Sequence, residues 1–85
     1  VGAIDHDHQM PKYMEPCSSI LISAYSSNDH HRIATTDLGN NKCTLRHGGT
    51  SAAAPMVTGI IALALSIRPD LCWRDIQYLC VETAI

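Results

Sequence analysis

The fold of this chain is decided by the stretch from His47 to Ile67, which reads HGGTSAAAPMVTGIIALALSI. No residue between Thr50 and Ile67 is charged, and apolar side chains occur around the whole helical circumference instead of along one stripe. This pattern predicts a helix over residues 50–67 that is buried on all sides. The helix begins directly after a glycine turn, and Ser51 lies where the turn and the helix meet.

The same uncharged run raises the alternative of a membrane-spanning helix. A span needs roughly 17 to 25 apolar residues, and this run lies at the lower limit. Pro55, Thr58, Gly59 and Ser66 lower its hydrophobicity, no aromatic belt flanks it, and Arg68 is the one nearby cation. A buried helix of a globular protein is therefore favoured, with a membrane-anchored interaction peptide as the alternative.

The segments before the glycine turn predict short strands. Residues 1–4 form an apolar run ahead of the polar stretch 5–11, which indicates a strand followed by an exposed loop. The runs 19–25 and 32–37 are rich in strand-compatible residues and predict an antiparallel hairpin. Glycine and asparagine within residues 38–42 predict a turn, since both tolerate positive φ.

The C-terminal segment predicts a second helix. Residues 68–70, Arg-Pro-Asp, break the long helix. Side chains at spacings of three and four then indicate an amphipathic helix: Trp73, Ile76, Gln77, Leu79 and Cys80. Strands and helices together place the chain in the α/β class.

The bulk composition is that of a protein interior. Apolar residues make up 46% of the 85 residues and charged residues 16%, which argues against disorder. The formal net charge is −2 and the six Lys and Arg residues do not cluster, so nucleic-acid binding is excluded as a function. A domain of this length buries a smaller fraction of its surface than a typical enzyme does, and the chain starts on an apolar run without an initiator Met or signal peptide. We therefore expect residues 1–85 to be an incomplete part of a larger domain.

The surroundings of Ser51 suit nucleophilic chemistry. Gly48 and Gly49 let a substrate backbone approach closely, and neighbours no larger than Ala or Thr leave the hydroxyl accessible. The helix N-terminus offers unpaired N–H groups and a positive dipole end, which would stabilise a developing oxyanion. The alternative is an ordinary helix start with Thr50 or Ser51 as the N-cap.

The segment GTSAAAP at residues 49–55 is similar to the nucleophile motif of subtilisin-like serine proteases, and HGGTSAAAP resembles the form of the kexin and furin branch. Other segments resemble the same branch in the family's order: YSS at 25–27, IATTDL at 33–38, CT at 43–44 and WRDIQ at 73–77. The resemblance covers nearly the whole chain. It implies that residues 1–85 are the C-terminal part of a catalytic domain, an incomplete three-layer fold of strand, hairpin, buried nucleophile helix and C-terminal amphipathic helix.

The resemblance implies a serine endopeptidase that processes proproteins after paired basic residues. Ser51 would be the nucleophile and its backbone N–H an oxyanion donor, with Gly49 and Thr50 in contact with the substrate. His47 would be a structural neighbour and not the base. In the family, the triad aspartate, the triad histidine and the side chain that completes the oxyanion hole precede this region. The alternative is a non-catalytic subtilisin-like domain with a binding or structural role.

A structural calcium, disulfide bonds and a compartment are implied by the same resemblance. Glu15 matches a family position that ligates calcium, and carboxylate oxygens suit that ion. Cys17 and Cys43 would pair with upstream cysteines. The partner would be a protein or peptide substrate with a basic cleavage site. The compartment would be the secretory pathway, in the Golgi or as a secreted protein, and any membrane anchor would lie outside this segment.

Two further interpretations are disfavoured by the residues themselves. The stretch Asp5 to His8 and the pair His30 and His31 could supply metal ligands, because carboxylate and imidazole both bind divalent ions. Adjacent residues on extended backbone point in opposite directions, so solvated loops are favoured. An α/β-hydrolase would need glycine at Ala53 to complete its G-x-S-x-G elbow.

Overall fold

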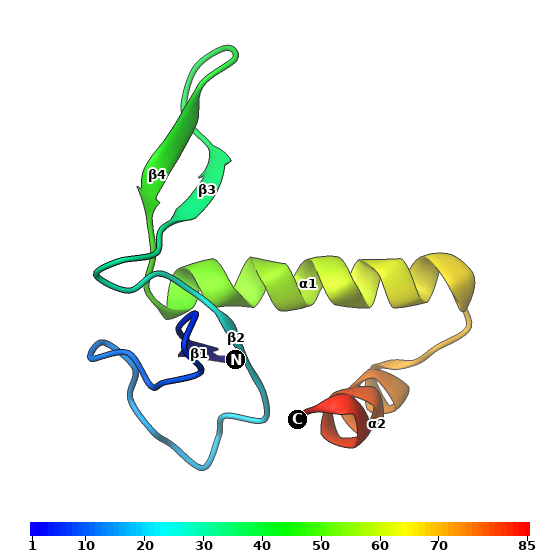
Figure 1. Cartoon of the computed structure of the whole chain (residues 1–85). Coiled ribbons are helices and arrows are strands. Elements are labelled where there is room, and N and C mark those ends of the chain that lie inside the picture. Colours follow the sequence, from blue (N-terminus) through cyan, green and yellow to red (C-terminus); the bar gives the residue numbers. More distant parts are fainter.

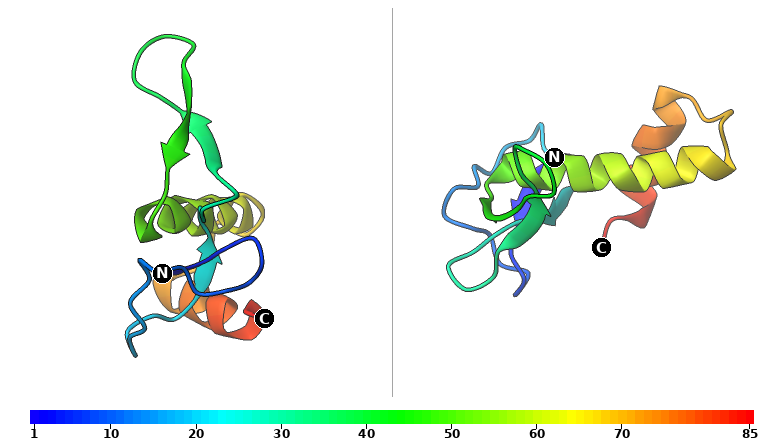
Figure 2. Two further views of the ribbon diagram at one scale, coloured as in Figure 1. Left: turned by 60° about the vertical axis from the view of Figure 1, so that its left-hand side comes forward. Right: turned by 90° about the horizontal axis from the view of Figure 1, so that it is seen from above.

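The computed structural model describes all residues, 1–85, and contains four short strands and two helices (Figure 1). They are β1 (Gly2–Ile4), β2 (Ser23–Tyr25), β3 (Ile33–Thr36), β4 (Cys43–His47), α1 (Thr50–Ile67) and α2 (Trp73–Thr83). The α/β assignment and both predicted helices are thereby confirmed. The β3–β4 hairpin projects from one side of α1, whereas β1, β2 and α2 lie on the other side (Figures 1 and 2).

The first sheet is parallel, which the sequence did not predict. β1 and β2 pair with Ala3 opposite Ala24. The expected antiparallel hairpin between residues 19–25 and 32–37 is therefore wrong. Parallel strands need a connection of a dozen or more residues, and residues 5–22 supply it between β1 and β2. The run at 19–25 thus pairs with the chain start instead of with its neighbour in sequence.

The hairpin of the structure is formed by β3 and β4, which pair antiparallel with Thr36 opposite Cys43. The predicted turn over residues 38–42 is confirmed. Gly39 has φ 103° and Asn41 has φ 55°, and these are left-handed conformations that glycine and asparagine tolerate. The sequence analysis did not predict β4, although apolar and polar residues alternate from Cys43 to Arg46, because four residues are the lower limit for recognising that pattern.

The core lies where the N-terminal part of α1 packs on β1 and β2. Its buried apolar side chains are all small or medium in size: Ala3, Ala52, Ala53 and Val57. Ala53 has 0% of its surface exposed. Small side chains let the helix approach the strands closely, but they remove little apolar area from water. This contact fixes the start of α1 against the parallel sheet.

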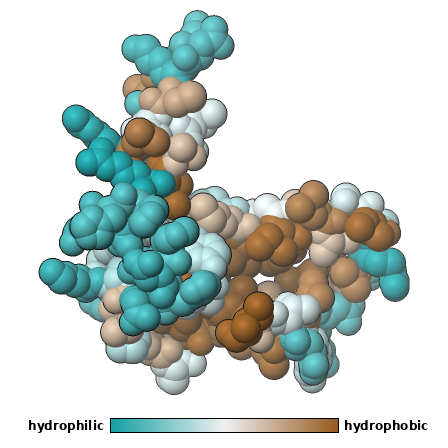
Figure 3. All heavy atoms as spheres, viewed as in Figure 1, coloured by the Kyte–Doolittle hydropathy of each residue, from teal (hydrophilic) through white to brown (hydrophobic).

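The remainder of α1 is exposed, which contradicts the expectation of a helix buried on all sides. Ile60, Leu63 and Ile67 are 63%, 69% and 79% exposed, and apolar side chains gather over α1 and α2 in Figure 3. The radius of gyration is 14.3 Å, whereas a compact domain of this length has about 12 Å. Residues 1–85 therefore position one end of α1 and leave the other uncovered.

The length and composition of α1 also satisfy the criterion for a membrane span. Its mean hydropathy is 1.7 over 18 residues. Core helices of soluble proteins meet the same criterion, so the value alone does not distinguish the two interpretations.

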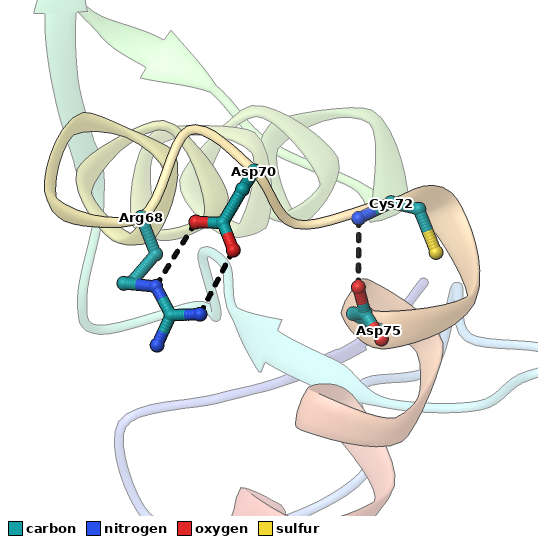
Figure 4. Close-up of polar contacts among 4 residues, drawn as sticks. All are labelled: Arg68, Asp70, Cys72 and Asp75. Carbon is teal, nitrogen blue, oxygen red and sulfur yellow. Dashed lines mark hydrogen bonds and ion pairs between the residues drawn. The ribbon is translucent and has the colours of Figure 1, made fainter.

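A short polar connection joins the two helices (Figure 4). The guanidinium of Arg68 donates two hydrogen bonds to the carboxylate of Asp70, at 3.0 and 2.9 Å, and this pairing lowers the pKa of Asp70. The carboxylate of Asp75 accepts the backbone N–H of Cys72 at 2.8 Å and caps the first turn of α2. The predicted break at residues 68–70 is confirmed.

Candidate active site

The candidate site is built on the turn between β4 and α1. Gly49 precedes the helix as its N-cap residue, with φ 75° and ψ 179°, a conformation that favours glycine. No side chain caps the helix, so the alternative with Thr50 or Ser51 as N-cap is wrong. Gly48 packs against Ser27, and a Cβ atom at residue 48 would collide with the Ser27 hydroxyl. The path of the chain therefore favours glycine at both positions.

A buried serine outside the motif holds this turn in place. Ser26 is 3% exposed. Its backbone N–H donates to the carbonyl of Ile4 at 2.9 Å, and its hydroxyl donates to the carbonyl of Gly49 at 2.7 Å. Ser26 thus links the end of β1 to the start of α1. Sequence reasoning gave Ser26 no role, although the YSS segment at 25–27 that contains it resembles the kexin and furin branch.

Ser51 is the second residue of α1, and its side chain is exposed. Its hydroxyl takes part in none of the hydrogen bonds of the chain. Its backbone N–H belongs to the first helical turn, where amides have no intrahelical partner. That turn contains no capping side chain and no acidic residue. The helix start therefore presents free donors and a positive dipole end beside an accessible hydroxyl.

The structure brings no histidine ring to this hydroxyl. His47 ends β4, and its side chain is exposed. His8 Nε2 forms a hydrogen bond of 2.6 Å with the hydroxyl of Tyr25, and the rings of His6 and His31 stack with centroids 4.1 Å apart. No group of three or more His, Cys, Asp or Glu side chains is placed to hold a metal ion. Within residues 1–85, no histidine forms a hydrogen bond with the Ser51 hydroxyl.

Asp5 differs from the exposed loop residue that the sequence predicted. Its side chain is buried, and its Oδ1 accepts the backbone N–H groups of Gln9 and Asp7, each at 2.9 Å. Its Oδ2 accepts the side-chain amide of Asn28 at 3.3 Å. These hydrogen bonds, that from Gln9 foremost, hold the pKa of Asp5 below its ordinary value. Asp5 therefore organises its own loop and ties it to the segment after β2.

The candidate calcium ligand stands alone. Glu15 is exposed, and it belongs to no group of three or more His, Cys, Asp or Glu side chains that could hold a metal ion. Calcium takes roughly six to eight oxygen ligands. Residues 1–85 alone therefore do not fit a calcium ion.

All four cysteines are free thiols. Cys17, Cys43 and Cys72 are exposed, and Cys80 is partly so. The hydroxyl of Ser19 lies 3.1 Å from the Cys17 sulfur and lowers the pKa of that thiol. Cys17 and Cys43 are thus both open to partners outside these residues.

A polar hollow of about 410 Å³ lies beside the glycine turn. Its lining residues come from the segment after β2 and from β4: Ser27, Asn28, Arg32, Leu45, Arg46, His47 and Gly48. Sequence reasoning missed the hollow, because Arg32 and Arg46 come to line it together only through the hairpin, in which Ile33 lies opposite His47. The hollow is of interest because Gly48, one of its lining residues, belongs to the glycine turn that precedes Ser51.

The subtilase family model matches residues 1–84. The chain is 55% identical over 84 residues to the dibasic-processing endoprotease of Schizosaccharomyces pombe and 50% identical over 84 residues to the kexin of Candida albicans. It is 47% identical over 89 residues to the human proprotein convertase subtilisin/kexin type 7. Each match covers 99% of this chain, but 12%, 9% and 11% of the respective relative. The chain belongs to the subtilase family and spans about a tenth of the length of these relatives.

Proposed function

We propose that the protein containing these residues is a serine endopeptidase that processes proproteins, with Ser51 as its nucleophile. The observation that carries the proposal is an accessible serine hydroxyl on the uncapped first turn of a helix, directly after a glycine turn. Subtilase membership supports the reaction class. The name of the relative at 55% identity, a dibasic-processing endoprotease, supports the type of substrate.

In the proposed reaction, Ser51 Oγ attacks the carbonyl carbon of the scissile peptide bond. Its proton passes to a histidine outside residues 1–85, and the carbonyl oxygen becomes an oxyanion. The backbone N–H of Ser51 and a second donor outside this chain stabilise that oxyanion. The protonated histidine then donates its proton to the leaving amine as the C–N bond breaks, and water hydrolyses the remaining acyl-enzyme.

The turn supplies the space for the substrate in this mechanism. Gly49 has no side chain to obstruct the incoming peptide, and Thr50 directly precedes Ser51 and keeps part of its surface accessible. We therefore assign both residues to substrate contact. The hydrogen bond from Ser26 to the Gly49 carbonyl keeps the turn from shifting when the peptide binds. Acidic groups that select paired basic residues are assigned to sequence outside these 85 residues.

The supporting features of the family complete the proposal. Glu15 would contribute one ligand to a structural calcium whose other ligands lie outside this chain. Cys17 and Cys43 would form disulfide bonds to cysteines outside it, in keeping with a secretory-pathway protein. The apolar surface of α1 would be covered by further layers of a three-layer domain, which makes α1 a core helix and not a membrane span.

The nucleophile assignment is tested by Ser51→Ala in the complete protein. We expect cleavage of a fluorogenic peptide with a basic site to fall by about 10⁴-fold or more, because the nucleophile and its base act as one unit. Ser66→Ala is the matched control, since Ser66 lies on the same helix and its hydroxyl bonds only to the Leu63 carbonyl. Substantial turnover by a correctly folded Ser51→Ala enzyme would remove Ser51 from this role.

A further inference from the structure

The hollow beside the glycine turn is within reach of a bound substrate. Gly48 lines it and precedes Ser51 by three residues, a separation of at most about 10 Å along the chain. An extended peptide advances about 3.3 Å per residue. A group held in the hollow therefore lies within two or three substrate residues of the scissile bond.

The charges that line the hollow are all of one sign. Arg32 and Arg46 both contribute, and no Asp or Glu lines it. Neither arginine forms an ion pair, since the only salt bridge of the chain joins Arg68 to Asp70. A guanidinium offers a rigid fork of N–H donors that matches a carboxylate. The hollow thus has unused capacity for an acidic group.

The rim of the hollow is held in place by hydrogen bonds. The side-chain oxygen of Asn28 accepts the backbone N–H groups of His30 and His31 at 2.9 and 2.6 Å, and its amide donates to Asp5. The hydroxyl of Tyr13 donates to the Ser27 carbonyl at 2.6 Å. These contacts connect the rim to the packed loops next to β1 and β2.

We propose that Arg32 and Arg46 bind an acidic side chain of the substrate on the C-terminal side of the scissile bond. This inference rests on the proposed endopeptidase function. The assignment of the side follows from charge: basic residues precede the cleaved bond in that function, and two unpaired guanidinium groups would repel them. The residues that follow the bond are the ones that the hollow can attract.

The test uses the full-length protease and matched peptides with a paired basic site. Asp and Asn are compared at each of the first three positions after the cleaved bond, and kcat/KM is measured for each. We expect Asp to be preferred at one position by about fivefold or more, as charge-assisted hydrogen bonds allow. The preference should shrink as salt is raised, because these arginines are exposed.

Variants assign the preference to these side chains. Arg46→Gln should lower the ratio of kcat/KM for the Asp peptide to kcat/KM for the Asn peptide. The double variant Arg32→Gln and Arg46→Gln should bring this ratio to about one. Arg46→Lys should retain part of the preference for Asp. Arg74→Gln is the control with an unchanged ratio, since Arg74 lies on α2 with its guanidinium 5.1 Å from the Trp73 ring.

The outcomes separate this inference from the proposed function. A wild-type ratio near one at all three positions, or a ratio that survives the double variant, overturns the acidic pocket. Cleavage of the Asn peptides reports the endopeptidase activity independently. Failure to cleave any peptide contradicts the proposed function together with the inference.

Discussion

The two ends of α1 differ in how far the rest of the chain buries them. At its start, Ala52 and Ala53 are buried against β1 and β2, and Ser26 fastens the preceding turn. At its end, Leu63 and Ile67 are exposed. The residues present therefore suffice to orient the candidate nucleophile but not to bury the helix that carries it. Local geometry at an active site and stability of a domain are separate properties of a sequence.

The largest expected effect concerns the isolated chain. Expressed alone, residues 1–85 should show no cooperative thermal unfolding and should aggregate, because one helix end and α2 expose apolar side chains. They should also not hydrolyse a basic-site peptide, since an unassisted serine hydroxyl is a weak nucleophile. Circular dichroism melts and a fluorogenic assay with calcium measure both. A cooperative melt of a soluble monomer would show that the uncovered end needs no partner.

In the complete protein, the apolar side chains at the C-terminal end of α1 should be buried. Leu63→Ala is expected to lower the free energy of unfolding by about 2–5 kcal/mol, the usual loss for a buried leucine. Leu38 is 92% exposed on the hairpin turn, and Leu38→Ala should change it by less than about 0.5 kcal/mol. Denaturant unfolding of both variants makes the comparison. Equal effects would mean that nothing covers the end of α1.

The anchored end is probed by Ser26→Ala. Loss of the hydroxyl leaves the Gly49 carbonyl without its hydrogen bond, which should lower the free energy of unfolding by about 1–3 kcal/mol. Peptide cleavage should fall as well, since the turn next to Ser51 loosens. Ser18→Ala, in the exposed loop before β2, is the control for removal of a hydroxyl. Unchanged stability and kinetics in Ser26→Ala would show that the hydroxyl of Ser26 does not hold the glycine turn in place.

The smallest effect is a pH dependence at Asp5. Its folded pKa lies below the ordinary value, so its carboxylate stabilises the protein above that ordinary value, and this contribution is lost as pH falls through the folded pKa. Asp5→Asn should therefore lower Tm more at pH 7 than at pH 3. Asp7→Asn, whose carboxylate accepts no hydrogen bond, is the control. A pH-independent difference would contradict the assigned role.

The helices were predictable and the strand pairing was not, for a physical reason. An uncharged run of 18 residues and the break at 68–70 are local signals, and helices form from local contacts. The pairing of β1 with β2 depends on a segment many residues away, and no pattern within 19–25 records it. The uncharged run predicts a helix buried on all sides, whereas residues 1–85 bury only its N-terminal part and leave Leu63 and Ile67 exposed.

The candidate site divides in the same way. Ser51, Gly49 and Thr50 are adjacent in sequence, and their small size marks them as a place for chemistry. Ser26 and the arginine-lined hollow come together only through β2 and the hairpin, so a linear motif could not reveal them. The sequence predicts a solvated loop for the polar stretch from Asp5, because a carboxylate that caps its own loop has no distinctive spacing in sequence.

The free hydroxyl of Ser51 has a consequence for cellular safety. No group within the chain forms a hydrogen bond with that hydroxyl. With Ser51 as the proposed nucleophile, its reactivity depends on a base supplied from outside residues 1–85. With that assignment, a degradation product that carries the nucleophile motif without the upstream histidine is expected to be inert toward neighbouring proteins.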